Sequence, residues 1–177
     1  MKRICVYCGS RNGALPAYRA AARELGEALL VRGISLVYGG MQGGLMGEIA
    51  DTVLEGGGEV IGIIPRTLAD RGEGHGCLTD LRVVDSMPER KGMMASLSDA
   101  FVVLPGGVGT LEEFFEIWSW ATLGLHEKPC GILNIERYYD RLIEFLDDAV
   151  AQGFLKAKHR ARVIVEEEPA RLLDRFA

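Results

Sequence analysis

The stretch AFVVLPGGVGTLEE, residues 100–113, joins an apolar segment to a glycine-rich turn and the start of a helical pattern. Residues 100–104 are apolar at every position, which is typical of a central strand in a parallel sheet. Residues 105–110 form the glycine-rich turn, and the helical pattern after them runs to about Leu123. The stretch therefore predicts one strand–turn–helix unit of an α/β protein.

The same unit repeats along the chain on both sides of this stretch. Further strands are predicted at residues 4–9, 34–38, 59–64, 81–84, 129–135 and 162–165. Further helices are predicted at residues 16–32, 45–55, 89–97, 138–152 and 169–176. Residues 65–80 are the one long stretch expected to be irregular, as a cover or a partner contact. We predict a single Rossmann-like, doubly wound α/β domain over residues 1–177, with a mostly parallel sheet and helices on both faces.

Composition excludes several classes of protein. The chain has 177 residues, a net charge of −5 and 48% hydrophobic residues, which is ordinary for a globular protein and argues against disorder. The acidic balance disfavours nucleic acid as a partner. Neither an apolar run of about 18 residues nor a signal peptide is recognisable, so we expect no membrane contact and a cytoplasmic location.

The cysteines and histidines do not indicate a redox or metal site. Cys5 and Cys8 have the spacing of a half-site, but they fall in a predicted strand, where positions three apart point to opposite faces. The three histidines lie far apart in the sequence and lack ligand spacing. We expect structural cysteines and no metal.

Two glycine-rich turns predict a phosphate site. Residues 39–44 and 105–110 each follow a strand and precede a helix, so both should lie at the carboxyl edge of the sheet. Backbone N–H groups of such a turn, together with a helix N-terminus, bind anions. Neither turn matches a P-loop or a dinucleotide fingerprint, which favours a phosphate monoester. The candidate residues of the second turn are Gly106, Gly107, Val108, Gly109 and Thr110.

The helix after the second turn carries a row of carboxylates on an otherwise apolar surface. Glu112 and Glu116 lie one helical turn apart, and Glu113 adjoins them. Buried carboxylates need partners, and the adjacent pair Arg90 and Lys91 at a predicted helix start would supply cations. Glu113 also fits a capping box with Thr110. If Glu113 caps the helix, Glu112 would carry the chemistry instead.

The segments MPERK (87–91) and PGGVGTLEE (105–113) resemble the paired signature of the LONELY GUY family, the cytokinin riboside 5′-monophosphate phosphoribohydrolases, whose members are often labelled lysine decarboxylases. The resemblance runs from about Ile4 to Val165. It implies hydrolysis of the N-glycosidic bond of purine nucleoside 5′-monophosphates, AMP included, without metal or organic cofactor, by a homodimer with sites near the subunit interface. It places the catalytic pair at Arg90 and Glu113.

The resemblance and the residue patterns together give the remaining binding candidates. Met87 is a candidate for one side of a flat apolar slot for the base. The family pattern adds the substrate-binding candidates Lys91, Leu111, Ser119, Ser10, Gly43 and Gly44. The chain departs from the family pattern at Met41, where a third glycine is usual, and at Gly72, where an acidic residue is usual. A non-catalytic nucleotide-binding sensor or carrier on the same fold is the alternative.

Overall fold

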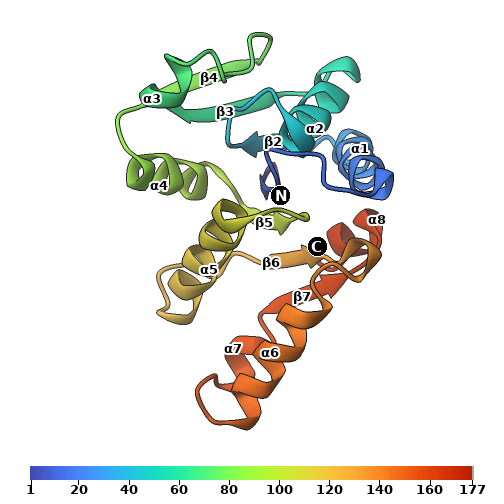
Figure 1. Ribbon diagram of the computed structural model, residues 1–177, viewed down its shortest axis with the longest axis vertical. Coiled ribbons are helices and arrows are strands. Elements are labelled where there is room, and N and C mark those ends of the chain that lie inside the picture. Colours follow the sequence, from blue (N-terminus) through green and yellow to red (C-terminus); the bar gives the residue numbers. More distant parts are fainter. Residues whose placement is uncertain (177) are drawn as a thin grey trace.

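The computed structural model describes residues 1–176 and contains a seven-stranded sheet of order β4-β3-β2-β1-β5-β6-β7 (Figure 1). All six strand pairings are parallel, so the doubly wound α/β prediction is confirmed. The chain winds outward from β1 to β4, returns to the centre, and winds outward on the other side from β5 to β7. The strand order therefore reverses between β1 and β5. The strands are β1 (Arg3–Tyr7), β2 (Ser35–Tyr38), β3 (Val60–Pro65), β4 (Asp80–Val84), β5 (Ala100–Val103), β6 (Cys130–Leu133) and β7 (Val163–Glu166).

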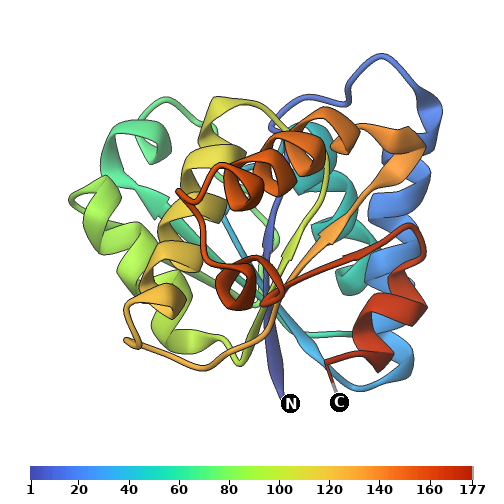
Figure 2. The same ribbon diagram turned by 90° about the horizontal axis from the view of Figure 1, so that it is seen from below.

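Helices cover both faces of the sheet, as Figures 1 and 2 show. One apolar cluster joins one face of the sheet to α1 (Pro16–Val31), α2 (Gly44–Glu55) and α8 (Pro169–Asp174). A second cluster joins the other face to α4 (Met87–Leu97), α5 (Val108–Thr122) and α6 (Asp140–Ala151). The shorter elements are α3 (Arg66–Ala69), η1 (Ile135–Arg137) and α7 (Ala157–Arg160).

The strands are buried on both sides because helices lie against each face. Residues 100–103 of β5 are all buried, which agrees with their uniformly apolar sequence. Cys5 packs in the second cluster and Cys8 in the first, and both are free thiols. Burial raises the pKa of both thiols far above the ordinary value, so they remain neutral core residues, as predicted.

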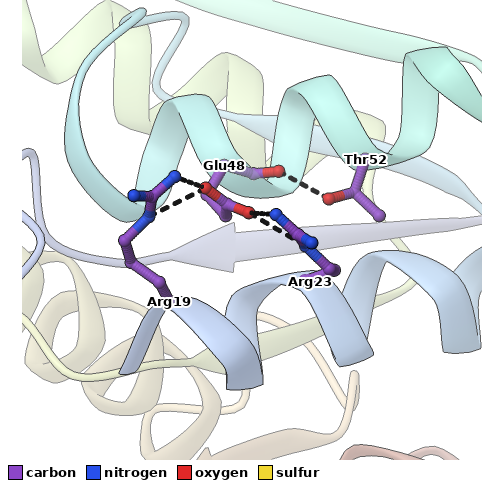
Figure 3. Close-up of polar contacts among 4 residues, drawn as sticks. All are labelled: Arg19, Arg23, Glu48 and Thr52. Carbon is purple, nitrogen blue, oxygen red and sulfur yellow. Dashed lines mark hydrogen bonds and ion pairs between the residues drawn. The ribbon is translucent and has the colours of Figure 1, made fainter. Parts of the chain in front are cut away.

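A polar contact joins α1 and α2 beside their apolar interface (Figure 3). Glu48 of α2 receives hydrogen bonds from the guanidinium groups of Arg19 and Arg23 of α1, and the Arg23 Nη2–Oε1 distance is 2.6 Å. Thr52 donates to the Glu48 carbonyl oxygen one turn earlier. The hydrogen bonds from Arg19 and Arg23 hold the pKa of Glu48 below its ordinary value. Helix α2, which follows the first glycine turn, is therefore fixed to α1.

The stretch 65–80 is more ordered than the sequence predicts. It contains α3, and Gly74 forms an isolated antiparallel bridge with Met41. His75 is buried, and its Nε2 lies 2.9 Å from Asp51 Oδ1 of α2. These contacts tie the stretch to the turn after β2 and to α2, whereas the sequence predicts an irregular cover or partner contact. None of the helices in the described chain has the length and apolar run that a bilayer span requires.

Candidate active site

A cavity of about 550 Å³ lies at the carboxyl ends of β1 and β5 and is the candidate active site. This is the point where the strand order reverses, the usual ligand position in an open α/β sheet. The turn after β1 and the turn after β5 form two of its walls, and α4 and α5 contribute Arg90 and Glu113. The fold thus brings the paired sequence signatures to one cavity.

The turn after β5 leaves the amino end of α5 open to the cavity. Gly107 is the N-cap residue, and no side chain caps the helix there. A Cβ on Gly106 would lie 2.1 Å from Thr110 Oγ1, so packing demands glycine at this position. Gly107 and Gly109 border open space, where a Cβ would meet nothing within 4 Å. Free space beside unpaired N–H groups is the arrangement that an anion needs.

The turn after β2 lies beside the cavity and contributes Met41 to its wall. Gly44 has φ +66°, and a Cβ there would lie 2.3 Å from the Arg11 backbone nitrogen. The amides of Leu45 and Met46 donate to the Gly9 carbonyl oxygen at 3.0 and 3.3 Å. Among the described residues, Gly43 and Gly44 are not part of the cavity wall. The lack of a side chain at Gly44 accordingly lets the turn after β1 pack closely against the turn after β2.

Arg90 is buried at the carboxyl ends of β2 and β3. Its Nε donates to the Ile63 carbonyl oxygen at 2.9 Å, and its Nη2 donates to the Gly39 carbonyl oxygen at 2.8 Å. Arg90 is 5% exposed. Helix α4 begins at Met87, two residues before the predicted start. The Ser86 side chain caps it there by accepting a hydrogen bond from the Glu89 amide. Arg90 therefore lies in the first turn of α4, aimed into the sheet edge.

Glu113 lies opposite Arg90 and is 4% exposed. The two charged groups are 3.5 Å apart, from Arg90 Nη1 to Glu113 Oε1. Burial raises the pKa of Glu113 to about 7, against the opposing effect of the Arg90 charge. The capping-box interpretation is wrong, because α5 starts at Val108 and Thr110 is already inside the helix. The Glu113 carboxylate is consequently available to a ligand.

Glu112 lies in different surroundings from Glu113. It is half exposed and forms an ion pair with Lys91, and Lys91 Nζ also lies 3.0 Å from Glu116 Oε2. Burial lowers the pKa of Lys91, but the hydrogen bonds to the two carboxylates outweigh it and leave the pKa raised. Lys91 is thus a charged partner for the outer carboxylates of α5.

The predicted site residues divide into two groups. Those that line the cavity are Ser10, Met87, Arg90, Gly106, Gly107, Val108, Gly109, Thr110, Glu112 and Glu113. Those outside its lining, within the described chain, are Gly43, Gly44, Lys91, Leu111 and Ser119. Ser119 is on the exposed surface of α5.

Several cavity residues were not predicted from the sequence. Tyr138 lines the cavity, donates from its hydroxyl to the Gly106 carbonyl oxygen at 2.7 Å, and packs edge-on against Tyr18. Apolar side chains form another part of the wall, alongside Met87. The further lining residues that sequence reasoning missed are Cys8, Gly9, Arg11, Asn12, Gly13, Met41, Leu45, Met46 and Pro105. The turn after β1 has the same position as the two glycine turns, because it also follows a strand and precedes a helix.

Comparisons with known proteins identify relatives of this chain. A family model described as "Possible lysine decarboxylase" matches residues 46–176. A rice protein named Cytokinin riboside 5′-monophosphate phosphoribohydrolase LOG is 48% identical over 172 residues, covering 97% of this chain and 71% of the rice protein. A protein of Arabidopsis thaliana with the same enzyme name is 47% identical over 174 residues, covering 98% of this chain and 80% of its own length.

Solved structures share the fold at lower sequence identity. The molybdenum cofactor carrier protein from Chlamydomonas reinhardtii is 22% identical with a TM-score of 0.73, covering 98% of this chain and 94% of its own. The molybdenum cofactor binding protein from Rippkaea orientalis is 21% identical with a TM-score of 0.72, with the same coverages. At this identity the likeness concerns the fold alone.

Proposed function

The chain belongs to the LONELY GUY family of cytokinin riboside 5′-monophosphate phosphoribohydrolases, and we propose from this premise that it hydrolyses the N-glycosidic bond of purine nucleoside 5′-monophosphates. The products are the free base and ribose 5-phosphate. One observation carries the proposal: a buried carboxylate, Glu113, faces Arg90 in a cavity that also receives the amino end of α5. Binding of a nucleotide alone does not require the buried carboxylate.

The amino end of α5 supplies the phosphate position. The helix has 15 residues, so its N-terminus carries a positive end of about half an elementary charge. Gly107 and Gly109 leave room for phosphate oxygens beside the first amides of the helix. Binding the phosphate there positions the sugar, because remote binding energy orients the reacting centre.

Glu113 is the proposed catalytic carboxylate. Cleavage of an N-glycosidic bond develops positive charge on the sugar, and an ionised carboxylate near the anomeric carbon stabilises that charge and orients the attacking water. A pKa of about 7 lets the same group hold or release a proton near neutral pH. Arg90 favours the ionised form and holds the carboxylate in place through its bonds to Ile63 and Gly39.

The base position is assigned to the apolar part of the wall. Met41, Leu45, Met46 and Met87 line the cavity there. Methionine side chains adapt to flat and irregular apolar groups, which fits a purine with or without an N6 substituent. Hydrolysis of both AMP and an N6-prenylated nucleotide is thus part of the proposal.

We also propose that the chain works as a cytoplasmic homodimer that pairs through α5. Phe115 and Leu123 lie on the exposed side of this helix region and are 38% and 71% exposed. Ser119 lies between them at helical spacing. An exposed apolar stripe of this kind is typical of a subunit interface, and it would bring Ser119 next to a second copy.

The test is product analysis with the purified protein. AMP and isopentenyladenosine monophosphate are incubated separately, and base and ribose 5-phosphate are quantified by chromatography. Equal amounts of base and ribose 5-phosphate establish the hydrolase, and the rates of release rank the two substrates. Binding of either nucleotide without base release would instead support the non-catalytic sensor or carrier.

A further inference from the structure

The charged side chains that line the cavity differ in whether other groups of the protein pair with them. In the part of the chain that the structure describes, the charged lining residues are Arg11, Arg90, Glu112 and Glu113. A phosphate monoester brings a further charge of about −1.5 to −2 at pH 7. Placing that anion in a cavity with two carboxylates requires a cation that is not already neutralised by them.

Arg90 does not provide this cation. Its Nε and Nη2 donate to backbone carbonyl oxygens of Ile63 and Gly39, and its Nη1 faces Glu113. Lys91, the other nearby cation, is paired with Glu112 and Glu116. Both side chains are thus held by groups of the protein itself.

Arg11 also lines the cavity, and its side chain is not paired with any group in the part of the chain that the structure describes. Over residues 1–176, its guanidinium forms neither a hydrogen bond nor an ion pair with the protein, and the residue is exposed. Its backbone, in contrast, is fixed. Gly9, two residues earlier, donates to the Pro105 carbonyl oxygen at 3.0 Å, and a Cβ on Gly44 would collide with the Arg11 nitrogen. A fixed backbone with a free guanidinium is suited to a ligand that arrives from solution.

We infer that Arg11 binds the 5′-phosphate of the substrate, opposite the amino end of α5, and thereby selects nucleotides over nucleosides. This inference rests on the proposed function. A guanidinium presents two parallel N–H donors that match two phosphate oxygens, and it stays charged at every physiological pH. The α5 amides would contact the phosphate from one side and Arg11 from the other.

The test measures binding separately from turnover. Ribose 5-phosphate and adenosine are titrated calorimetrically into four proteins: the unmodified protein, Arg11→Gln, Arg11→Lys and the control Arg141→Gln, which removes an exposed arginine of α6 outside the cavity. Arg11→Gln is expected to weaken ribose 5-phosphate binding about tenfold to a hundredfold, since one charged hydrogen-bonding group is lost. Arg11→Lys should lie in between, and adenosine binding should not change. In turnover, kcat/KM for AMP should fall by the same factor.

The outcomes separate this inference from the proposed function. If AMP is hydrolysed and Arg11→Gln binds ribose 5-phosphate as the unmodified protein does, the inference is overturned and the function stands. Equal weakening for ribose 5-phosphate and adenosine also overturns it, because the loss is then structural. If AMP is not hydrolysed but ribose 5-phosphate binding depends on Arg11, the inference stands and the function falls. No binding of ribose 5-phosphate to the unmodified protein at millimolar concentration overturns the inference, and the function is then decided by AMP hydrolysis alone.

Discussion

Replacing Glu113 by glutamine should stabilise the protein at alkaline pH while it removes activity. The carboxyl is 4% exposed, and burial disfavours its charged form more than the Arg90 charge favours it. Glutamine has nearly the same shape and carries no charge. The substitution therefore removes the electrostatic cost of burying an ionised carboxylate, which the proposed chemistry requires in the native site.

The magnitude follows from the two pKa values of Glu113. The carboxyl has an ordinary pKa of 4.5, which applies to the unfolded chain, and a pKa of about 7 in the folded protein. Between these values the folded state binds more protons, so the free energy of unfolding falls as pH rises. The difference of about 2.5 corresponds to about 3 kcal/mol, at about 1.4 kcal/mol for each pKa unit. This stability is present below pH 4.5 and lost once pH passes 7.

Urea unfolding at several pH values between 4.5 and 8 measures this effect. The stability of Glu113→Gln relative to the unmodified protein should rise by about 3 kcal/mol over this range. Glu48→Gln is the matched control with the opposite sign: its pKa is lowered by Arg19 and Arg23, so the native carboxylate stabilises at neutral pH and that advantage disappears in acid. If the curves for Glu113→Gln and the unmodified protein run parallel, the account of Glu113 burial is refuted.

Three further outcomes are expected. Gly44→Ala should lower the Tm well below that of Gly57→Ala. Both glycines have positive φ, which costs about 1–2 kcal/mol in an L-residue. The added Cβ at Gly44 also meets the Arg11 nitrogen, whereas the added Cβ at Gly57 meets nothing within 4 Å. Equal Tm values would contradict the steric role of Gly44. Arg137 has φ 60°, so Arg137→Gly should unfold at the same or a higher temperature and Arg137→Val at a lower one, as thermal scans can check. Base release should increase with pH through about 7 as Glu113 ionises, and a pH-independent rate would count against that residue.

The fold was readable from the sequence because its strongest signals are local. Residues 100–104 are apolar throughout, and β5 is buried on both faces. Gly33 and Gly56 follow predicted helices, and α1 and α2 end just before them. Such patterns depend on neighbouring residues and need no knowledge of tertiary contacts.

Some element boundaries were missed where local signals conflict. Helix α6 begins at Asp140, after a 3-10 turn in which Glu136 and Arg137 adopt positive φ. Neither residue type predicts that conformation, since glycine or asparagine is usual there. The turn is held instead by Asn134, whose side-chain oxygen accepts from the Tyr139 amide at 2.7 Å. That contact could not be anticipated from propensity.

The site was predicted in part for similar reasons. The sequence placed Arg90 and both carboxylates near each other, but the choice between Glu112 and Glu113 depends on where α5 begins. Because the N-cap residue is Gly107 and not Thr110, Glu113 is not part of a capping box. Tyr18 and Tyr138 reach the cavity through packing between distant segments, which no single sequence pattern reports, whereas Arg11 lies in the turn after β1 beside the predicted Ser10.

The rate of base release by Glu113→Gln and Glu112→Gln, measured side by side with AMP at pH 8, tests the central assignment most directly. Both substitutions remove one carboxylate from α5, one facing Arg90 and the other facing Lys91. We expect Glu113→Gln to lose at least a hundredfold in kcat, in the range found for a group acting in proton transfer, and Glu112→Gln to retain most of its activity. Loss of activity in Glu112→Gln with an active Glu113→Gln would contradict the account.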